Sequence, residues 1–226
     1  GTHQVAHIDL NGNMKHITSG NHDINNFTYA AGKIVANMNT ISKAVELYDV
    51  NLESGELTQL TDINHEIYEH IKMGEVQERW ITTTDGKKML TWVILPPNFD
   101  PTKKYPTLLY CQGGPQSTVS QFWSYRWNFQ LMAAQGYVVV APNRRGCPSF
   151  GQEWTEQISG DYPGLNMQDY LVAARTVKAE PYVDKMAACG ASYGGYSVYY
   201  LCGTHGDVFD AFIAHAGIFN EEHMYM

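Results

Sequence analysis

The sequence lacks the features that indicate a membrane protein or a nucleic-acid-binding protein. Its longest apolar stretches, such as Tyr137–Pro142, are far shorter than the roughly 18–20 residues that a membrane-spanning helix needs. No run of five like charges occurs, and 15 Lys and Arg stand against 23 Asp and Glu, for a net charge of −8. No signal peptide is recognisable at the start. We therefore expect no membrane span and no nucleic-acid partner.

Cysteine is scarce and irregularly spaced. The four cysteines are Cys111, Cys147, Cys189 and Cys202, and they form no C-x-x-C pair. Cysteine usually behaves as a small apolar residue, so we predict four buried or half-buried thiols rather than disulfides. A zinc site would need distant histidines, and we expect neither a metal site nor a cofactor.

Apolar residues are plentiful enough for a folded core, at 44% of the chain with 12% aromatic. Residues 1–75 consist of short alternating segments separated by Asn, Gly, Asp and Ser, which is typical of β-hairpins, and no helical pattern competes there. From residue 76 onward, apolar strands alternate with helical stretches, which is typical of a mostly parallel α/β sheet. We therefore predict two domains, 1–75 and 76–226.

The pattern of the second region predicts a specific series of elements. Its predicted strands are Gln77–Thr83, Met89–Leu95, Thr107–Cys111, Tyr137–Ala141, Met186–Gly190 and Ala211–Ala216. Its predicted helices are Gln121–Ala134, Met167–Ala179 and Tyr193–Cys202.

The first region contains an internal repeat. Asp9–Thr18 can be aligned with Asn51–Thr61 with one inserted residue, at a period of 43. A period of about 40–45 residues with short strands is typical of a β-propeller blade, but a closed propeller needs about four to eight blades. About one and a half such units fit before residue 75. The region is thus either the last blade or blades of a propeller or a small β-domain that resembles one.

Gly190–Gly194 reads G-x-S-x-G. An apolar strand leads into it and a helix follows, which is the strand, sharp turn and helix of a nucleophile elbow in the α/β-hydrolase fold. We therefore predict Ser192 as a catalytic nucleophile, the alternative being a glycine-rich structural turn. A nucleophilic serine needs donors for the oxyanion: the N–H of Tyr193, and an N–H of the loop Cys111–Pro115, which follows an earlier strand. Seen alone, that loop could also be an ordinary turn.

The general base is harder to find. In this fold the chain order is serine, then acid, then histidine, and only 34 residues follow Ser192. His205 lies at the far end of the predicted helix, roughly 15 Å along its axis from the serine. His215 falls on the very next strand, and His223 follows it closely. We expect no complete triad here and interpret these histidines as surface or core-edge residues.

Four segments carry a more specific pattern, in this order: Thr107–Ser117, Pro142–Gly151, Gly160–Tyr170 and Gly190–Tyr196. Together they resemble the prolyl oligopeptidase family of serine peptidases, and in particular its bacterial dipeptidyl-peptidase and acylaminoacyl-peptidase branch. The resemblance implies a β-propeller followed by an α/β-hydrolase domain. It also implies an enzyme that releases dipeptides or short N-terminal units from oligopeptides through an acyl-enzyme.

Carried over position by position, the resemblance implies roles for five residues. Ser192 matches the nucleophile, and Gly114 and Tyr193 match the backbone donors of the oxyanion hole. Asp161 and Asp169 match acidic positions that are structural in the family. Where many relatives have histidine before the two glycines, this chain has glutamine. Because the oxyanion donor is a backbone N–H, we expect the hole to be kept.

The resemblance further places the acid and base of the family beyond Met226 and most of its propeller before Gly1. We therefore expect the last propeller blade or blades followed by the first half of a hydrolase domain, with little activity on their own. Because the relatives that the resemblance points to are secreted to the bacterial periplasm, we expect a periplasmic location, with the cytoplasm as the alternative that unpaired cysteines and the lack of a recognisable signal would suit. A homodimer remains open.

Two other functions stay open. An esterase or lipase of the same fold would use the same elbow and would turn over acyl esters without cleaving dipeptidyl amides. A propeller-based binding protein with a decayed hydrolase domain would lack the downstream acid and base.

Overall fold

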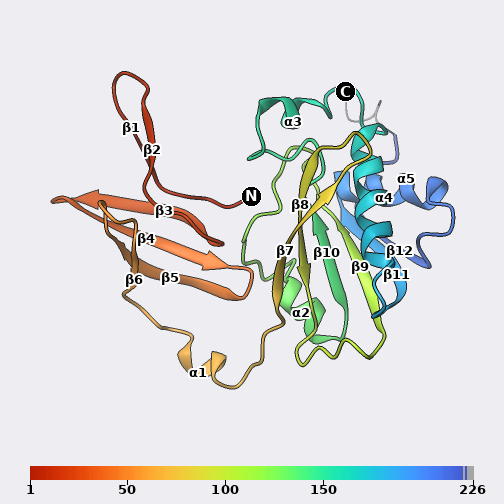
Figure 1. Cartoon of the computed structure of the whole chain (residues 1–226), viewed down its shortest axis with the longest axis horizontal. Helices are drawn as coiled ribbons and strands as arrows, with labels where there is room; N and C mark the ends of the chain where they lie inside the picture. Colours follow the sequence, from red (N-terminus) through yellow and green to blue (C-terminus); the bar gives the residue numbers. More distant parts are fainter. Residues whose placement is uncertain (221, 223–226) are drawn as a thin grey trace. The chain divides into compact units, whose positions relative to one another are not determined.

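The computed structural model describes residues 1–220 and 222, and these form two compact units, which we treat separately (Figure 1). The β unit comprises Thr2–Met73 together with Ser120–Asn128. The α/β unit comprises Gly1, Gly74–Val119 and the described residues from Phe129 onward. The change of unit after Met73 lies close to the predicted boundary, whereas the return of the chain to the β unit at 120–128 has no counterpart in the predicted domains.

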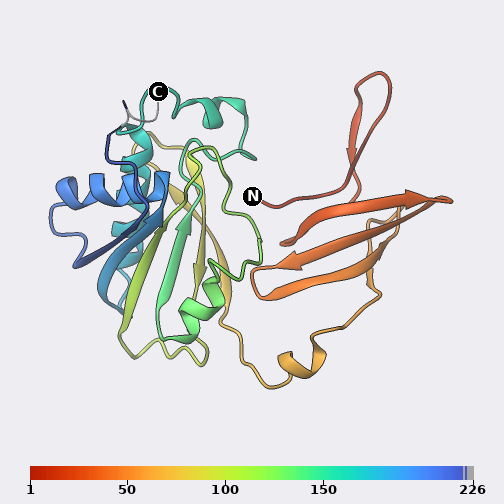
Figure 2. The same cartoon turned by 180° about the vertical axis from the view of Figure 1, so that it is seen from behind.

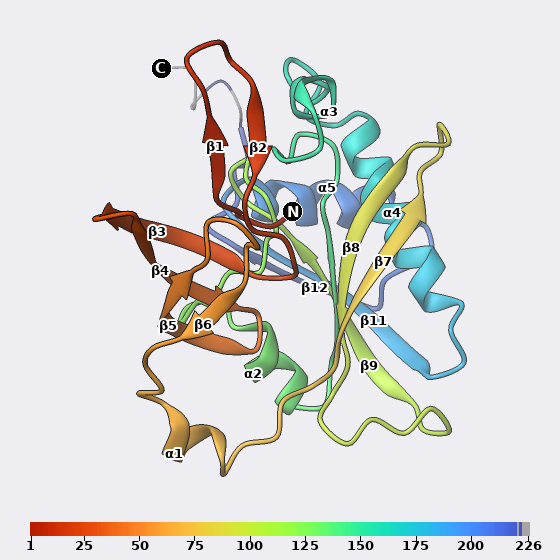
Figure 3. The same ribbon diagram turned by 60° about the vertical axis from the view of Figure 1, so that its left-hand side comes forward.

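The β unit is a hairpin followed by a four-stranded antiparallel sheet (Figure 3). The hairpin pairs β1 (Ala6–Ile8) with β2 (Met14–His16), and the sheet has the order β3 (Asp23–Ala30), β4 (Lys33–Thr40), β5 (Lys43–Val50) and β6 (Leu57–Gln59). A single helical turn, α1 (His65–Tyr68), follows. The prediction of no helix in this region is wrong there, because four residues are too few to give a helical period.

The sequence repeat corresponds to a repeated hairpin. In the β1–β2 turn the N–H of Asp9 donates to the carbonyl of Asn13 at 3.0 Å, and in the β5–β6 turn the N–H of Asn51 donates to the carbonyl of Glu56 at 2.9 Å. The side chain of the first residue of each turn accepts hydrogen bonds from backbone N–H groups two to four residues later. The one inserted residue of the alignment is thus the extra residue of the second turn.

The β unit buries one face of its sheet. The core of this unit joins the hairpin to the sheet through apolar side chains of Val5, Ile17, Ile24, Ile34, Ala36 and Val50. On the opposite face, Val35, Val45 and Leu47 are 37%, 43% and 42% exposed. Because alternate residues of a strand point to opposite faces, the sheet has a second apolar face that the described residues of this unit leave open.

The α/β unit is built on a six-stranded sheet of order β12-β11-β9-β10-β8-β7. Its strands are β7 (Val76–Thr82), β8 (Lys88–Ile94), β9 (Tyr105–Cys111), β10 (Val138–Pro142), β11 (Val183–Ala191) and β12 (Ala211–His215). The pairs β7–β8 and β8–β10 are antiparallel, and the pairs from β10 to β12 are parallel. The predicted strands and the α/β class are confirmed.

Helices cover both faces of this sheet (Figure 2). The helices are α2 (Phe129–Ala134), α3 (Gln152–Glu156), α4 (Leu165–Lys178) and α5 (Tyr193–Thr204). Leu109 and Cys111 of β9 belong to the core cluster formed with α4 and α5, whereas Tyr110 between them contacts Phe129 of α2, with 4.9 Å between ring centroids. No helix in the described part of the chain is long and apolar enough to cross a membrane.

The predicted helix over residues 121–134 is wrong in its first half, because α2 begins only at Phe129. The hydroxyl of Ser124 accepts hydrogen bonds from the N–H groups of Arg126 and Trp127, at 3.1 Å each, and such local bonds compete with a helix. Within the β unit, Asn39 donates to the carbonyl of Gln121 at 2.7 Å. This contact joins residues 82 positions apart, so sequence periodicity could not reveal it.

The thiol prediction is confirmed at three positions. All four cysteines are free, and Cys111, Cys147 and Cys189 are buried. Cys202 is exposed, because it lies on the outer side of α5, so the prediction that it is at least half-buried is wrong.

Candidate active site

Ser192 stands between β11 and α5 in a strained backbone conformation, with φ 58° and ψ −123°. Residues other than glycine avoid positive φ, and such strain costs about 1–3 kcal/mol and is concentrated at functional sites. The N–H of Ser192 donates to the carbonyl of His215 at 3.0 Å, which anchors the turn to β12. The side chain is exposed, and its hydroxyl forms no hydrogen bond within residues 1–220 and 222.

Glycines at the turn allow backbone to pack directly on backbone. A Cβ added at Gly194 would lie 2.1 Å from the carbonyl oxygen of Cys111, and one at Gly190 would lie 2.7 Å from the same oxygen. Real Cβ atoms do not approach backbone oxygens this closely. The turn after β11 is therefore pressed against the end of β9, where a larger residue would push the two apart.

The loop that follows β9 lies beside Ser192. Because β9 and β11 are parallel neighbours that pair Cys111 with Gly190, both strands end at the same edge of the sheet. A Cβ built on Gly113 would lie 3.7 Å from the Cβ of Ser192. The backbone N–H groups of Gly113, Gly114 and Tyr193 have no hydrogen-bond acceptor in the part of the chain that is described. Unpaired N–H groups beside a serine are the donors that an oxyanion requires.

Tyr193 is buried, although its predicted role concerns only its backbone N–H. Its phenol donates towards the carbonyl of Tyr162 and the amide oxygen of Asn166, at 3.1 and 3.2 Å. Burial raises the pKa of Tyr193 above its ordinary value of 10.0. The phenol therefore stays protonated and holds the first turn of α5 to Tyr162 and to the first turn of α4.

A buried ion network fixes the loop after β10. Arg145 donates from its backbone N–H and its Nε to Asp169 of α4, at 2.9 Å each, and from Nη1 and Nη2 to Asp85 of the β7–β8 turn, at 3.1 and 2.8 Å. Asp161 lies at the turn before α4, where its carbonyl accepts from Asn166 at 3.1 Å. The carboxylate of Asp169 thus holds the loop after β10 to α4, as expected of a structural residue, whereas the contact of Asp161 uses its backbone and leaves the role of its carboxylate a prediction.

The substitution Asp85→Asn is expected to remove an acid-dependent part of the stability. Hydrogen bonds from Arg145 are the chief cause that holds the pKa of Asp85 below its ordinary value of 3.8. A carboxylate with a lowered pKa stabilises the fold fully above its unfolded pKa and loses that contribution as the pH falls through the folded value. The difference in melting temperature between wild type and variant should be constant above about pH 5 and shrink below about pH 4. A difference that stays the same from pH 6 to pH 3 would contradict this account.

No described histidine side chain forms a hydrogen bond with the Ser192 hydroxyl. His205 lies just after α5, where its Nδ1 accepts from the N–H of Phe209 at 3.2 Å and its ring packs on aromatic neighbours. His215 contributes its backbone carbonyl to the turn, and its side chain forms no hydrogen bond with Ser192. His223 lies outside the described residues.

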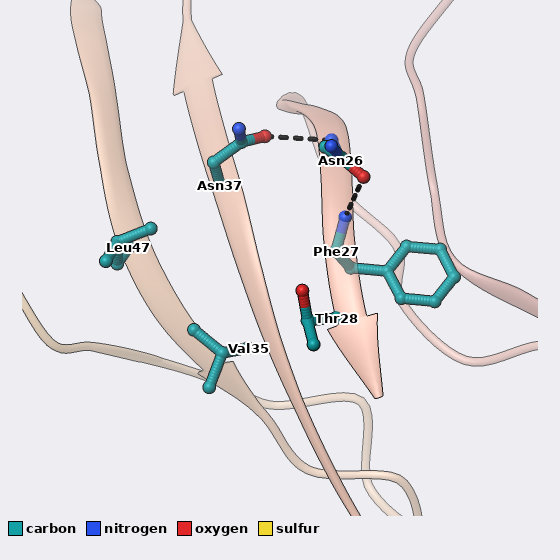
Figure 4. Close-up of a pocket in the computed structure, with 6 residues that line it drawn as sticks. All are labelled: Asn26, Phe27, Thr28, Val35, Asn37 and Leu47. Atoms are coloured by element: carbon teal, nitrogen blue, oxygen red, sulfur yellow. Dashed lines mark hydrogen bonds between the residues drawn. The ribbon is translucent and has the colours of Figure 1, made fainter. Parts of the chain in front are cut away.

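Two other features bear on ligand binding. No group of three or more His, Cys, Asp or Glu side chains able to hold a metal ion occurs within residues 1–220 and 222. An open hollow of about 240 Å³ lies on the exposed face of the β3–β5 sheet, far in sequence from Ser192. Figure 4 shows the residues that line it. Among them, the N–H of Asn26 donates to the side-chain oxygen of Asn37 at 2.8 Å.

This geometry is typical of the nucleophile elbow of α/β serine hydrolases. Ser192 is strained and exposed between a buried strand and a helix, and it lies beside the glycine loop, Gly113–Gly114, whose N–H groups are unpaired. Comparison with known proteins points to one family. Residues 123–226 match the sequence model of the prolyl oligopeptidase family, so this part of the chain is similar to that family.

Curated relatives match almost the whole chain. Dipeptidyl-peptidase 5 from Porphyromonas gingivalis is 54% identical over 216 residues, which are 95% of this chain and 32% of that protein. Dipeptidyl-peptidase 5 from Porphyromonas endodontalis is 50% identical over 218 residues, which are 96% of this chain and 32% of that protein. The chain thus spans about a third of the length of these relatives.

Solved structures of peptidases have a similar fold. An acylaminoacyl peptidase in complex with Z-Gly-Gly-Phe-chloromethyl ketone superposes with a TM-score of 0.86 at 27% identity, covering 96% of this chain and 34% of that one. Acylaminoacyl peptidase from Pyrococcus horikoshii gives a TM-score of 0.81 at 27% identity over 91% of this chain and 32% of that one.

Proposed function

We propose that the chain is part of a longer serine exopeptidase that releases dipeptides or short N-terminal units from oligopeptides. The observation that carries this proposal is the strained, exposed Ser192 beside the unpaired N–H groups of the glycine loop. The names of the relatives, dipeptidyl-peptidase 5 and acylaminoacyl peptidase, support peptides as the substrate class.

The proposed chemistry is acyl transfer. The hydroxyl oxygen of Ser192 attacks the peptide carbonyl while a base takes its proton, and the base returns that proton to the leaving amine. The backbone N–H groups of Gly114 and Tyr193 stabilise the oxyanion. Water then hydrolyses the acyl-enzyme and regenerates the serine. We propose that the base and its acid come from the part of the longer protein that these 226 residues do not include, so that the 226 residues alone should be nearly inactive.

We further propose that the β unit is the last part of a β-propeller and that the α/β unit is the first half of an α/β-hydrolase domain. The repeated hairpin supports a propeller, since stacked blades of four strands give a period of about 40–45 residues. The open apolar face around the hollow in Figure 4 would then pack against another blade of the complete protein.

The complete protein should cleave fluorogenic dipeptidyl amides and release the intact dipeptide. Initial rates on a panel of aminoacyl, dipeptidyl and N-acyl-aminoacyl amides would define the unit that is removed. Turnover of acyl esters without any amide hydrolysis would instead establish an esterase of the same fold. A folded protein that hydrolyses neither substrate but retains peptide binding would establish a binding protein.

A further inference from the structure

Arg144 is a buried cation that has no carboxylate partner among the residues that the structure describes. Its side chain is 0% exposed, as is that of Arg145, but only Arg145 is paired, with Asp85 and Asp169. A buried charge is costly unless hydrogen bonds and dipoles compensate it. Neutral groups must therefore compensate the charge of Arg144. The sequence shows Arg144 and Arg145 one residue after an apolar strand, but it does not show which groups they contact.

Four neutral groups around the guanidinium compensate its charge. Nε of Arg144 donates to the hydroxyl of Tyr170 at 3.2 Å, Nη1 to the carbonyl of Arg145 at 2.9 Å, and Nη2 to the carbonyl of Gln112 at 3.3 Å. The guanidinium carbon also lies 4.9 Å from the centroid of the Tyr193 ring. The side chain of Arg144 thus contacts both Gln112, which precedes Gly113, and Tyr193, which follows the candidate nucleophile Ser192.

The contact with Gln112 fixes a peptide plane beside Ser192. Because the peptide unit is planar and trans, holding the carbonyl of Gln112 also sets the direction of the N–H of Gly113, which points the opposite way. A hydrogen bond donated to the carbonyl polarises the peptide and makes that N–H a stronger donor. Gly113 directly precedes Gly114, whose N–H is the proposed oxyanion donor, and the Cβ position of Gly113 lies 3.7 Å from the Cβ of Ser192. Holding the Gln112–Gly113 peptide therefore fixes the start of the segment that carries the donor.

We propose that Arg144 is a positioning residue of the oxyanion site. It holds the glycine loop and the first residue of α5 in fixed relation, and its unneutralised charge favours negative charge nearby. The inference rests on the proposed function, acyl transfer at Ser192, and adds a residue that contacts the loop and the elbow. Lysine could not replace it fully, since a single ammonium group cannot donate in the fixed fork that serves three separate acceptors.

The test compares Arg144→Met and Arg144→Lys with wild type in the complete protein. Arg144→Met should lower kcat by about 10²-fold, the effect of displacing the oxyanion donors by about 1 Å from the nucleophile, with KM changed less than about threefold. Arg144→Lys should lower kcat by about tenfold. Affinity for a peptide aldehyde, which forms a tetrahedral oxyanion adduct, should fall in parallel with kcat/KM, while affinity for the released dipeptide should not change.

The matched control is Arg79→Met. Arg79 belongs to the same unit and pairs with Glu180 at 3.1 Å. The kcat of this variant should equal that of wild type. Circular dichroism checks folding. Wild-type kcat and aldehyde affinity in Arg144→Met would overturn this inference and leave the proposed function standing. Failure of both Arg144 variants to fold would also overturn it, because the residue would then be structural. Absence of hydrolysis in wild type would overturn the proposed function itself.

Discussion

Replacing Ser192 by alanine is expected to lower kcat of the complete protein on dipeptidyl amides by on the order of 10⁵-fold. The acyl-enzyme cannot form without the hydroxyl oxygen, whereas the oxyanion donors and the substrate contacts remain. KM should therefore change much less than kcat. The melting temperature should also stay within a few degrees of wild type, because the hydroxyl is exposed and forms no hydrogen bond within the described residues.

The matched control for this variant is Ser159→Ala, at an exposed serine of the same unit, which should retain wild-type kcat. Initial rates under saturating substrate give the comparison. A loss of less than about tenfold in Ser192→Ala would mean that another residue is the nucleophile. A large loss accompanied by a collapse of the melting temperature would assign Ser192 to structure rather than chemistry.

Replacing Gly194 by alanine is expected to damage both stability and activity. The new Cβ would lie 2.1 Å from the carbonyl oxygen of Cys111, so the backbone of the elbow and that of the glycine loop must separate. Overpacking of this kind costs about 1–3 kcal/mol in the free energy of unfolding. A displacement of about 1 Å between nucleophile and oxyanion donors can cost about 10²-fold in kcat.

Gly203→Ala on the same helix is the matched control for that substitution. Among the described residues, nothing outside its own helix turn and chain neighbours lies within 4 Å of its Cβ position. Alanine in a helix is about 0.5–1 kcal/mol more favourable than glycine, so this variant should be slightly more stable and fully active. Denaturant unfolding and initial rates on both variants measure the contrast. Equal stability and activity in Gly194→Ala and Gly203→Ala would show that the close approach at the elbow does not matter.

The parts of the fold that could be predicted are those specified by local sequence. The apolar strand, the glycines and the following helix around Ser192 lie within about 20 consecutive residues, and the structure confirms that arrangement, while the role of the serine stays a proposal. The hairpin repeat was equally visible, because each turn begins with Asp9 or Asn51, whose side chains bond to their own turn.

The parts that could not be predicted depend on contacts between distant segments. Residues 120–128 carry helical spacing, but Gln121 bonds to Asn39, 82 positions away. Arg144 was invisible for the same reason, because its contacts with Gln112 and Tyr193 bridge 32 and 49 positions along the chain. Periodicity reports which face of an element is apolar, and it does not report which loop an arginine reaches.

The central claim is that Ser192 is an activated nucleophile in the complete protein. A fluorophosphonate probe reacts covalently with such a serine, and mass spectrometry of the digested product identifies the modified peptide. The account predicts a single adduct on the peptide that contains Ser192, formed in step with the loss of amide hydrolysis and absent in Ser192→Ala. Complete loss of hydrolysis with the adduct on any other peptide, or full activity after Ser192 is modified, would contradict it.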